Sequence, residues 1–369
     1  MKNKLKEWMR SPAFNIGLIV LLTGCVLFVT VRHDGKEIFS VLRSVSIPGL
    51  IGIICLMIFE RVLHGWGLKY ECNQAHPHYT LKQGFLNAYT AGLFCGITPG
   101  ASGGQIAQAF LFHRQGIPAA HSAGILWLDF IVYQSVMTLF VLFLLIMRFH
   151  YFYSNYSQFF LIVLGGFAIS SAIIVFLWLL TRSPKFYTWL TTKGIHIASK
   201  LHIVRDEEAA LRKLDGLLQD FARELVVLQT HKKMIWLLGL ENLTRLVIYY
   251  SVPYFCAKAL HIPIGPERLL DIISLSSFVA MVNAFLPMPG SSGGTEATFV
   301  LMFSTIFDTV DAVSIMLLWR FVTYYQTLII GTCAYLYAKS LPPVPISEKE
   351  IAVPRTYTSA AMNNEGESE

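Results

Sequence analysis

Three long stretches of the sequence contain no charged side chain, and they limit the folds open to this chain more than any other feature. They cover residues 11–31, 83–112 and 149–181. An α-helix needs about 20 mostly apolar residues to cross the hydrocarbon core of a bilayer. Hydrophobic residues make up 54% of the 369 residues and charged residues only 14%, whereas soluble domains carry about 25% charged residues. The sequence therefore predicts an integral membrane protein built from α-helices.

The low charge content and the cysteine pattern argue against a soluble enzyme, a disulfide scaffold and a nucleic-acid binder. The six cysteines show no C-x-x-C spacing, and five of them lie inside apolar segments, where cysteine behaves as a small hydrophobe. Cys72, His76 and His78 have the side chains of a metal site, but no further ligands cluster nearby, so an ordinary polar loop is favoured. We expect neither a metal ion nor a cofactor, and no directly bound nucleic acid.

Six apolar segments are long enough for full membrane spans, and two more are interrupted. The full spans are predicted near residues 12–31, 47–67, 119–147, 157–181, 233–257 and 312–338. The first of these is too long for the apolar core of a cleavable signal peptide. The stretches 84–112 and 269–307 are each broken by a cluster of Pro, Gly and Ser, and each half is too short to cross comfortably. The predicted fold class is all-α integral membrane, with about six full spans plus two re-entrant helical hairpins.

Basic residues predict the orientation and the domain organisation. With both termini in the cytoplasm, 20 of the 29 Lys and Arg residues fall inside and six outside, as the positive-inside rule requires. Residues 1–340 form a polytopic membrane domain, in which 182–233 carries leucines at helical spacing and predicts a cytoplasmic connector helix. A connector packed on the bundle is favoured over a partner-binding helix. The tail at 341–369 has four prolines and five acidic residues, which predicts disorder.

An internal repeat is the most informative feature of the sequence. Residues 99–104 read P-G-A-S-G-G, and residues 289–294 read P-G-S-S-G-G. The segments 126–130 and 318–321 then echo each other, and each is followed closely by a Tyr-Gln pair. In the predicted topology the first hairpin enters from the cytoplasm and the second from outside. Inverted repeats of this kind are common in transporters, with the substrate site at the midplane between the halves.

The repeated cluster has the chemistry of an anion site. Pro99 and Pro289 end the entering half-helix, because proline cannot continue the hydrogen-bond ladder, and the glycines let a ligand approach the main chain. Ser102 and Ser292 are suitable N-caps for the returning half-helix. Two helix N-termini would then point into the bilayer from opposite faces, each able to bind an anion. Close helix packing through small residues remains the alternative.

Charged residues inside the apolar segments narrow the function further, because such residues usually face a cavity or each other. They are Glu60, Arg61, Asp129, Glu241, Arg245, Asp271, Glu296 and Arg320. Two interpretations stay open: ion pairing alone, for instance between Asp129 and Arg320, or pairing together with ligand contact. Glu296 follows a predicted helix start, so it is either a first-turn acid favoured by the helix dipole or a partner for an ammonium group on the ligand.

A serine hydrolase is disfavoured. Residues 100–104 and 290–294 match G-x-S-x-G, but that motif needs a preceding strand and the serine needs a base. The histidines nearest the membrane, His64 and His121, lie close to span ends, and a duplicated nucleophile would be unusual.

The two motifs resemble a known family. Residues 97–105 (I-T-P-G-A-S-G-G-Q) and 286–296 (L-P-M-P-G-S-S-G-G-T-E), with Arg320 downstream, are similar to the membrane domain of lysylphosphatidylglycerol synthases. That domain is also called the flippase-like domain of the multiple peptide resistance factor, and the resemblance covers about residues 10–340. In that family the membrane domain is implied to move aminoacylated phosphatidylglycerol between leaflets, while a separate soluble domain transfers lysine from tRNA.

The resemblance implies a phospholipid partner and a set of lipid-binding residues. The partner would be anionic or aminoacylated phosphatidylglycerol, in a bacterial plasma membrane, with a link to resistance against cationic antimicrobial peptides. Whether the protein forms a homo-oligomer stays open. The expected lipid-binding residues are Pro99, Gly100, Ser102, Gly103, Gly104, Gln105, Pro289, Gly290, Ser292, Gly293, Gly294, Glu296 and Arg320.

Two functions from different classes follow. The first is a stand-alone lipid translocase or lipid-binding protein. The second is one component of a phosphatidylglycerol lysyltransferase, and it needs an acyltransferase domain supplied by another chain. After the last predicted span only a short polar tail follows in this sequence, which favours the translocase.

Overall fold

The computed structural model describes residues 35–148, 232–283 and 293–345, except for 75 and 99, and seven helical positions between 165 and 176. These residues form helices joined by short turns, and no strand occurs among them. The all-α class predicted from the sequence therefore holds for the described part of the chain. The predicted spans at 12–31 and, except for those seven positions, at 157–181 lie outside it. So do the predicted connector before residue 232 and the predicted tail beyond residue 345.

Three described helical segments are long and apolar enough to cross a membrane. They are α4 (Ile47–Cys72), most of α7 (Ala119–Met147), and the continuous run Thr309–Ser340. That run consists of α14 (Thr309–Arg320), the π-helical turn η2 (Phe321–Tyr325) and α15 (Gln326–Ser340). A fourth long helix, α11 (Lys232–Ala259), occupies the span predicted at 233–257 but carries Glu241 and Arg245 in its middle. The chain is thus a multi-pass helical membrane protein.

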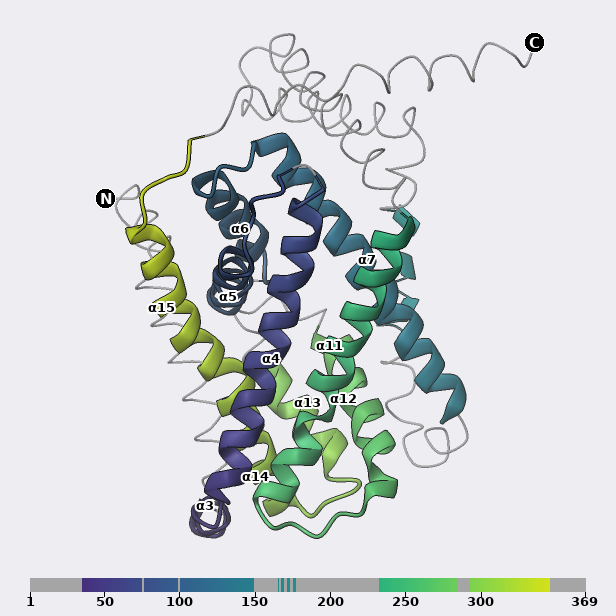
Figure 1. The fold of residues 1–369 in the computed structure, drawn as a ribbon. Helices are drawn as coiled ribbons and strands as arrows, with labels where there is room; N and C mark the ends of the chain where they lie inside the picture. The colour runs from purple at the N-terminus through teal and green to yellow at the C-terminus, as the bar shows by residue number, and fades with distance from the viewer. Residues whose placement is uncertain are drawn as a thin grey trace, which may run out of the picture.

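Both interrupted stretches are pairs of short helices. The first pair is α5 (Leu81–Ile97) and α6 (Gly103–Arg114), and the second is α12 (Leu269–Asn283) and α13 (Gly294–Phe303). Figure 1 shows α5 and α6 in the upper half of the molecule, whereas α12 lies in the lower half together with α14. The first break, between Ile97 and Gly103, falls at the first repeated Gly/Ser motif, as the sequence predicted. In the second pair, α13 begins at Gly294, the last residue of the second motif, and residues 284–292 lie outside the described part of the chain.

Local capping explains where several helices begin. The Ser46 hydroxyl accepts a hydrogen bond from the Gly49 amide ahead of α4. Thr80 and Gln83 form a reciprocal capping box at the start of α5, and the Asp308 carboxylate caps the Asp311 amide of α14. These side chains satisfy amide groups that have no partner inside the helix. The shorter elements α3 (Gly35–Arg43) and η1 (Pro266–Arg268) lie in the connections at the lower end.

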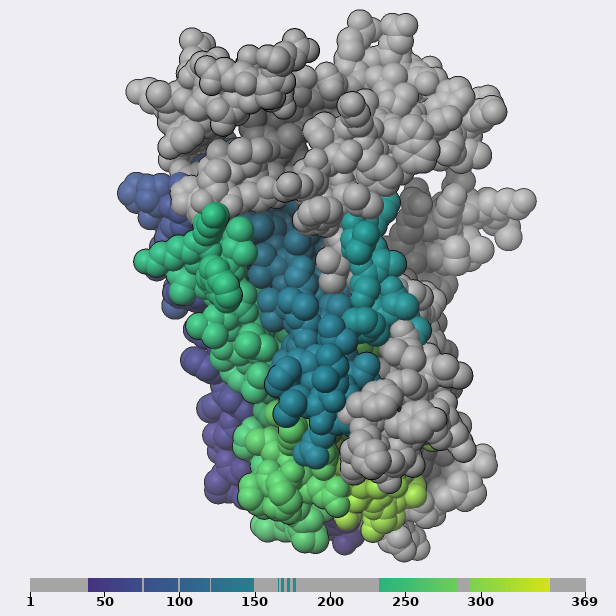
Figure 2. Space-filling model, turned by 90° about the vertical axis from the view of Figure 1, so that its right-hand side faces the viewer, coloured from purple at the N-terminus to yellow at the C-terminus, as the bar shows by residue number. Residues whose placement is uncertain are grey.

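The helix α4 packs between α5 and α11 and brings the two halves of the chain together. It crosses α5 at Gly65 and Gly84, where the backbones approach so closely that a Cβ on Gly65 would lie 2.6 Å from the Phe85 nitrogen. Small residues at a crossing of this kind allow tight helix packing inside a membrane. On the face shown in Figure 2, α7 runs beside the green surface of α11 and α12.

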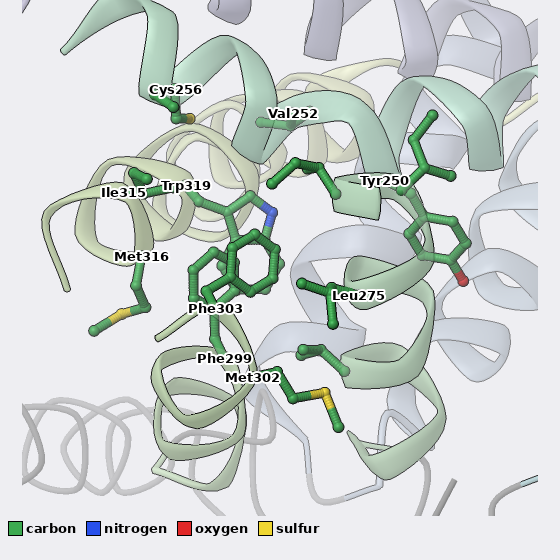
Figure 3. Packing of buried hydrophobic residues seen from close by; sticks show 14 of the residues in the cluster. Tyr250, Val252, Cys256, Leu275, Phe299, Met302, Phe303, Ile315, Met316 and Trp319 are labelled. Carbon is green, nitrogen blue, oxygen red and sulfur yellow. The ribbon is translucent and has the colours of Figure 1, made fainter. Parts of the chain in front are cut away.

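The largest apolar cluster lies among α11, α12, α13 and α14. At its centre Phe299 stacks on Phe303 with ring centroids 3.9 Å apart, and on Trp319 with ring centroids 4.9 Å apart (Figure 3). Trp319 immediately precedes Arg320, so this packing fixes the end of α14 against α13. The apolar core thereby positions a charged residue of the second half.

The segment after the last helix is also anchored. The Val344 amide donates to the Arg114 carbonyl, and the Arg114 guanidinium donates to the Leu341 carbonyl at 2.8 Å. The first residues of the predicted tail, 341–345, are therefore seated against the end of α6.

Candidate functional site

The second repeated motif places a buried ion pair at the start of α13. The Gly293 amide donates to Glu296 Oε2 at 2.7 Å, and Arg320 Nε donates to Glu296 Oε1 at 2.8 Å. Glu296 is 2% exposed and Arg320 is 7% exposed. Gly293 adopts a φ of 90°, a conformation that glycine reaches without strain. Glu296 is therefore a first-turn acid, and each of its carboxylate oxygens already accepts a hydrogen bond.

Arg320 lies where the two halves of the chain meet. It is the last residue of α14 and directly precedes the π-helical turn η2; such turns frequently occur at functional sites. Its guanidinium lies 5.0 Å from the ring centroid of Tyr324, and the Tyr324 hydroxyl donates to the Gly96 carbonyl at 3.1 Å. Gly96 is near the end of α5, just before the first repeated motif. Tyr324 thus connects the ion pair of the second motif to the break in the first hairpin.

The first motif reverses the chain through two residues with positive φ, Gly100 at 60° and Ala101 at 55°. Ser102 stands at the N-cap position of α6, but its backbone is already helical and its side chain makes no capping hydrogen bond. The cap predicted at Ser102 is wrong, because an N-cap side chain reaches the next amides only from an extended backbone. Thr98 supplies it instead: its Oγ1 accepts from the Gly103 amide at 2.9 Å and donates to the Phe94 carbonyl.

The glycines that open α6 allow it to pack closely on α5. A Cβ on Gly104 would collide with Cys95 Sγ and lie 3.2 Å from the Ala91 carbonyl oxygen. Gly103 is similarly close to Thr98. The packing interpretation therefore accounts for both glycines, whereas Gly100, Ser102 and Gln105 are exposed. Pro99, Pro289, Gly290 and Ser292 lie outside the described residues.

A second group of charges is centred on Arg245 of α11. Arg245 Nε donates to Glu60 Oε1 at 2.9 Å, and Arg245 Nη1 contacts Glu241 Oε1 at 3.3 Å. The same nitrogen donates to Asn242 Oδ1 at 3.1 Å. Arg61 Nε lies 3.3 Å from the other Glu60 oxygen. The charges predicted inside the spans at positions 60, 61, 241 and 245 are therefore brought together between α4 and α11.

The two remaining acids contact residues outside this group, and Asp129 does not have the partner that was expected. Asp129 of α7 lies 3.6 Å from His64 of α4, measured between Oδ2 and Nε2. The suggested pair of Asp129 with Arg320 is wrong, because the first turn of α13 holds Arg320 while Asp129 faces α4. Asp271 contacts Arg148 at 3.1 Å and Arg268 at 3.3 Å. Asp271 is the acidic residue in the first turn of α12, and its two arginine partners belong to neither of the charge groups described above.

Arg61 and Tyr249 lie between the two charge groups. A Cβ on Gly92 of α5 would lie 3.4 Å from the Arg61 guanidinium carbon, so Arg61 extends toward the first hairpin. The Tyr249 ring of α11 lies 6.4 Å from that of Trp319, the residue before Arg320. Arg61 thus extends from the Glu60 group toward the first hairpin, and Tyr249 lies beside the end of α14.

Sequence reasoning missed several members of this network. They are His64, which contacts Asp129, together with Asn242, Tyr249 and Tyr324. Glu71, a fully buried acid near the end of α4, was missed as well. One available signal was the spacing of Glu60, His64, Gly67 and Glu71, which places all four on one face of a helix. The predicted span ended at residue 67, whereas α4 continues to Cys72, so the last of these residues was assigned to a loop.

Buried charges between long apolar helices and two broken helix pairs are typical of a polytopic membrane protein that encloses polar groups between its helices. The chain matches a family model described as "Lysylphosphatidylglycerol synthase TM region" over residues 15–331. It therefore belongs to that family, as the two motifs predicted, and is a membrane protein related to lysylphosphatidylglycerol biosynthesis. Searches of curated proteins and of solved structures gave no match.

Proposed function

We propose that this protein binds the head group of an anionic or aminoacylated phospholipid between its two halves and moves the lipid from one leaflet to the other. The observation that carries this proposal is the buried Arg320–Glu296 pair at the start of α13, connected through Tyr324 to the break between α5 and α6. A guanidinium and the N-terminal end of a helix are both suited to a phosphate group.

The proposed transport route follows from the placement of the two broken helix pairs. We take α5–α6 and α12–α13 as hairpins of an inverted repeat, with both chain termini in the cytoplasm of a bacterial cell. The second motif and Arg320 would hold the phosphate, and the first motif would form the other half of the site. In transporters built from inverted repeats, the substrate site lies where the repeats meet, and rocking of one half exposes it to each side in turn.

In this proposal Glu296 orients Arg320. With one oxygen on the Gly293 amide and the other on Arg320, the carboxylate holds the guanidinium in place when no lipid is bound. An arriving phosphate would share Arg320 with Glu296. A head group with an amine adds a cation that the same carboxylate can attract, which is the basis for preferring an aminoacylated lipid.

Lipid binding tests this site. Purified protein is mixed with phosphatidylglycerol, lysylphosphatidylglycerol and phosphatidylethanolamine, and the bound lipids are counted by native mass spectrometry. The double variant Arg320→Ala, Glu296→Gln removes the cation without leaving an unpaired carboxylate. Because a hydrogen bond to a charged group contributes about 1.5–3 kcal/mol, affinity for phosphatidylglycerol should fall by about tenfold or more.

The matched control is Arg268→Ala, which removes an exposed guanidinium near the start of α12. It should leave phosphatidylglycerol binding unchanged. Equal binding by the wild type and the Arg320, Glu296 double variant would contradict the head-group site.

A second candidate function has support from the family description, which names a synthase. In that case the chain would serve as the membrane component of a phosphatidylglycerol lysyltransferase. Supplying the purified protein with lysyl-tRNA and phosphatidylglycerol separates the two functions. We expect no lysylated lipid from this chain alone, and product formation would favour the synthase over the translocase.

A further inference from the structure

We infer that Glu71 of α4 binds a proton inside the membrane domain, and that release and uptake of this proton accompany the lipid movement proposed above. The coupling to lipid movement rests on the proposed function, whereas proton binding by Glu71 does not. The inference identifies a source of energy for transport: the proton gradient across the membrane in which the protein lies.

The first observation is the isolation of the Glu71 side chain. Glu71 is 0% exposed, and among the described residues neither of its carboxyl oxygens has a hydrogen-bond partner. Its backbone carbonyl, by contrast, accepts from the Gln74 amide in the usual way for a helix end. An ionised carboxylate without a cation or a donor is very unfavourable in an apolar interior. A neutral carboxylic acid, with a proton on one oxygen, removes most of that penalty.

The second observation is the charge around it. The groups that act electrostatically on Glu71 are two more acids, Asp129 of α7 and Glu241 of α11. The Cys72 thiol is next to Glu71 on α4, and the Tyr79 hydroxyl, in the segment between α4 and α5, donates to Gln115 Oε1 at 2.8 Å. The guanidinium groups of the Glu60 charge group have other partners: Arg245 contacts Glu60, Glu241 and Asn242, and Arg61 contacts Glu60. On α5, the titratable groups Tyr89 and Cys95 lie beside Arg61.

In this cluster the carboxyl groups outnumber the basic side chains. Glu60, Glu71, Asp129 and Glu241 face two guanidinium groups and one imidazole, so the cluster stays close to neutral only if it holds at least one proton. Metal binding does not explain the excess, because the described residues contain no group of three or more His, Cys, Asp or Glu placed to hold a metal ion. Buried acids and histidines arranged in this way serve as proton carriers in pumps and transporters.

The same face of α4 offers a route toward the proposed lipid site. From the helix end inward it carries Glu71, then Gly67, then His64 and then Glu60. The Glu241 carboxyl fills the space beside Gly67, where a Cβ would lie 3.3 Å from its carboxyl carbon. When the Glu71 O–H bond breaks, the proton passes to water at the end of α4, or to His64 or a neighbouring carboxylate along this face. The carboxylate left behind then favours an arrangement that brings a cation to it.

Infrared difference spectroscopy tests the proton directly. The protein in lipid nanodiscs is compared between acidic and alkaline buffer, and the carbonyl stretch of a protonated carboxylic acid is followed. The wild type should show a band that disappears in alkaline buffer, and Glu71→Gln should lack that band. Glu71→Asp should retain a band at a shifted frequency, which separates loss of the proton site from misfolding. Glu267→Gln, which removes an exposed carboxyl on η1, should leave the band unchanged. An unaltered band in Glu71→Gln would overturn the assignment.

Lipid movement in vesicles with an imposed pH gradient tests the coupling. The wild-type rate should change when the gradient is reversed, and the Glu71→Gln rate should not respond to the gradient. If lipid moves in the wild type at a rate independent of the gradient, the coupling is wrong and the proposed function stands. If no lipid moves at all, the coupling and the proposed function both fail, while the infrared band still decides whether Glu71 binds a proton.

Discussion

A buried guanidinium is useful to a lipid phosphate only if something holds it in place when the lipid is absent. In this protein Glu296 does so with one oxygen, while its other oxygen secures the first turn of α13. Tyr324 adds a ring against the same guanidinium. The side chain of Arg320 is therefore oriented before a ligand arrives, which reduces the entropy lost on binding.

This ion pair predicts how substitutions of Arg320 alone and of Arg320 together with Glu296 differ in their effect on stability. Arg320→Ala leaves a buried carboxylate without its cation, and breaking a buried ion pair costs about 3–5 kcal/mol. The double variant Arg320→Ala, Glu296→Gln removes both charges and should recover a substantial part of that loss. The measurement is the temperature at which half of the detergent-solubilised protein remains monodisperse. A double variant that is less stable than either single variant would show that the two residues act independently.

For the charged residues, the sequence predicts which positions are buried but does not predict their partners. Buried charges inside apolar segments could be identified by type and position, because their cost in a membrane requires a partner or a cavity. The partners could not be identified. Asp129 and Arg320 occupy similar places in the repeat, yet one faces His64 and the other Glu296, since partner choice depends on helix rotation and crossing. Glu71 was missed because the end of α4 was placed a turn too early.

At the scale of single elements, the breaks in the two interrupted stretches follow from backbone chemistry. A cluster of proline and glycine residues disfavours the continuation of a helix, so the break between α5 and α6 and the start of α13 at Gly294 were predictable. The residue that caps α6 was not predictable, because Ser102 and Thr98 are both suitable capping residues by type. Their backbone conformations decide between them: Ser102 is helical, whereas Thr98 is extended with φ −115° and ψ 145°.

The cap on α6 gives a prediction for Thr98. Thr98→Val keeps the shape of the side chain but removes the oxygen that accepts from the Gly103 amide, and loss of such a cap costs about 0.5–2 kcal/mol. Thermal unfolding should therefore begin at a lower temperature in Thr98→Val. Thr98→Ser retains the hydroxyl and should remain close to the wild type. Equal stability of the valine and serine variants would show that the cap contributes nothing.

The close packing of α5 on α6 gives a prediction for Gly104. Gly104→Ala places a methyl group against Cys95 Sγ and near the Ala91 carbonyl, and overpacking of this kind costs about 1–3 kcal/mol. Adding Cys95→Ala removes the sulfur and should restore part of the stability, measured by the same thermal assay. The rescue should be partial, because the contact with the Ala91 carbonyl remains. No rescue at all would mean that another contact limits this position.

At the scale of the whole molecule, the two broken helix pairs lie toward opposite ends of the helix bundle. The duplicated motifs allowed this arrangement to be expected from the sequence, because three full spans are predicted between the two hairpins, and an odd number of crossings places the hairpins on opposite sides of the membrane. The sequence alone could not supply the links between the halves. The contact of Tyr324 with Gly96 joins residues that are 228 positions apart, and no local pattern indicates it.

Cysteine accessibility tests the opposed orientation. In a variant without native cysteines, Ser102→Cys and Ser292→Cys are introduced one at a time, and labelling with a membrane-impermeant maleimide is compared in intact cells and in inverted membrane vesicles. The two positions should react from opposite sides of the membrane, because in the proposed inverted repeat each belongs to a hairpin that enters from a different face. Labelling of both positions from the same side would contradict the inverted repeat.

The most direct test of the proposed function is the movement of lipid itself. Purified protein is reconstituted into vesicles that contain a trace of phosphatidylglycerol with a fluorescent group on its head-group side, and a reductant added outside destroys only the fluorophores that reach the outer leaflet. A lipid translocase predicts a larger loss of fluorescence than in protein-free vesicles, and a much slower loss with the Arg320→Ala, Glu296→Gln double variant. The same loss with and without wild-type protein would contradict translocation of this lipid.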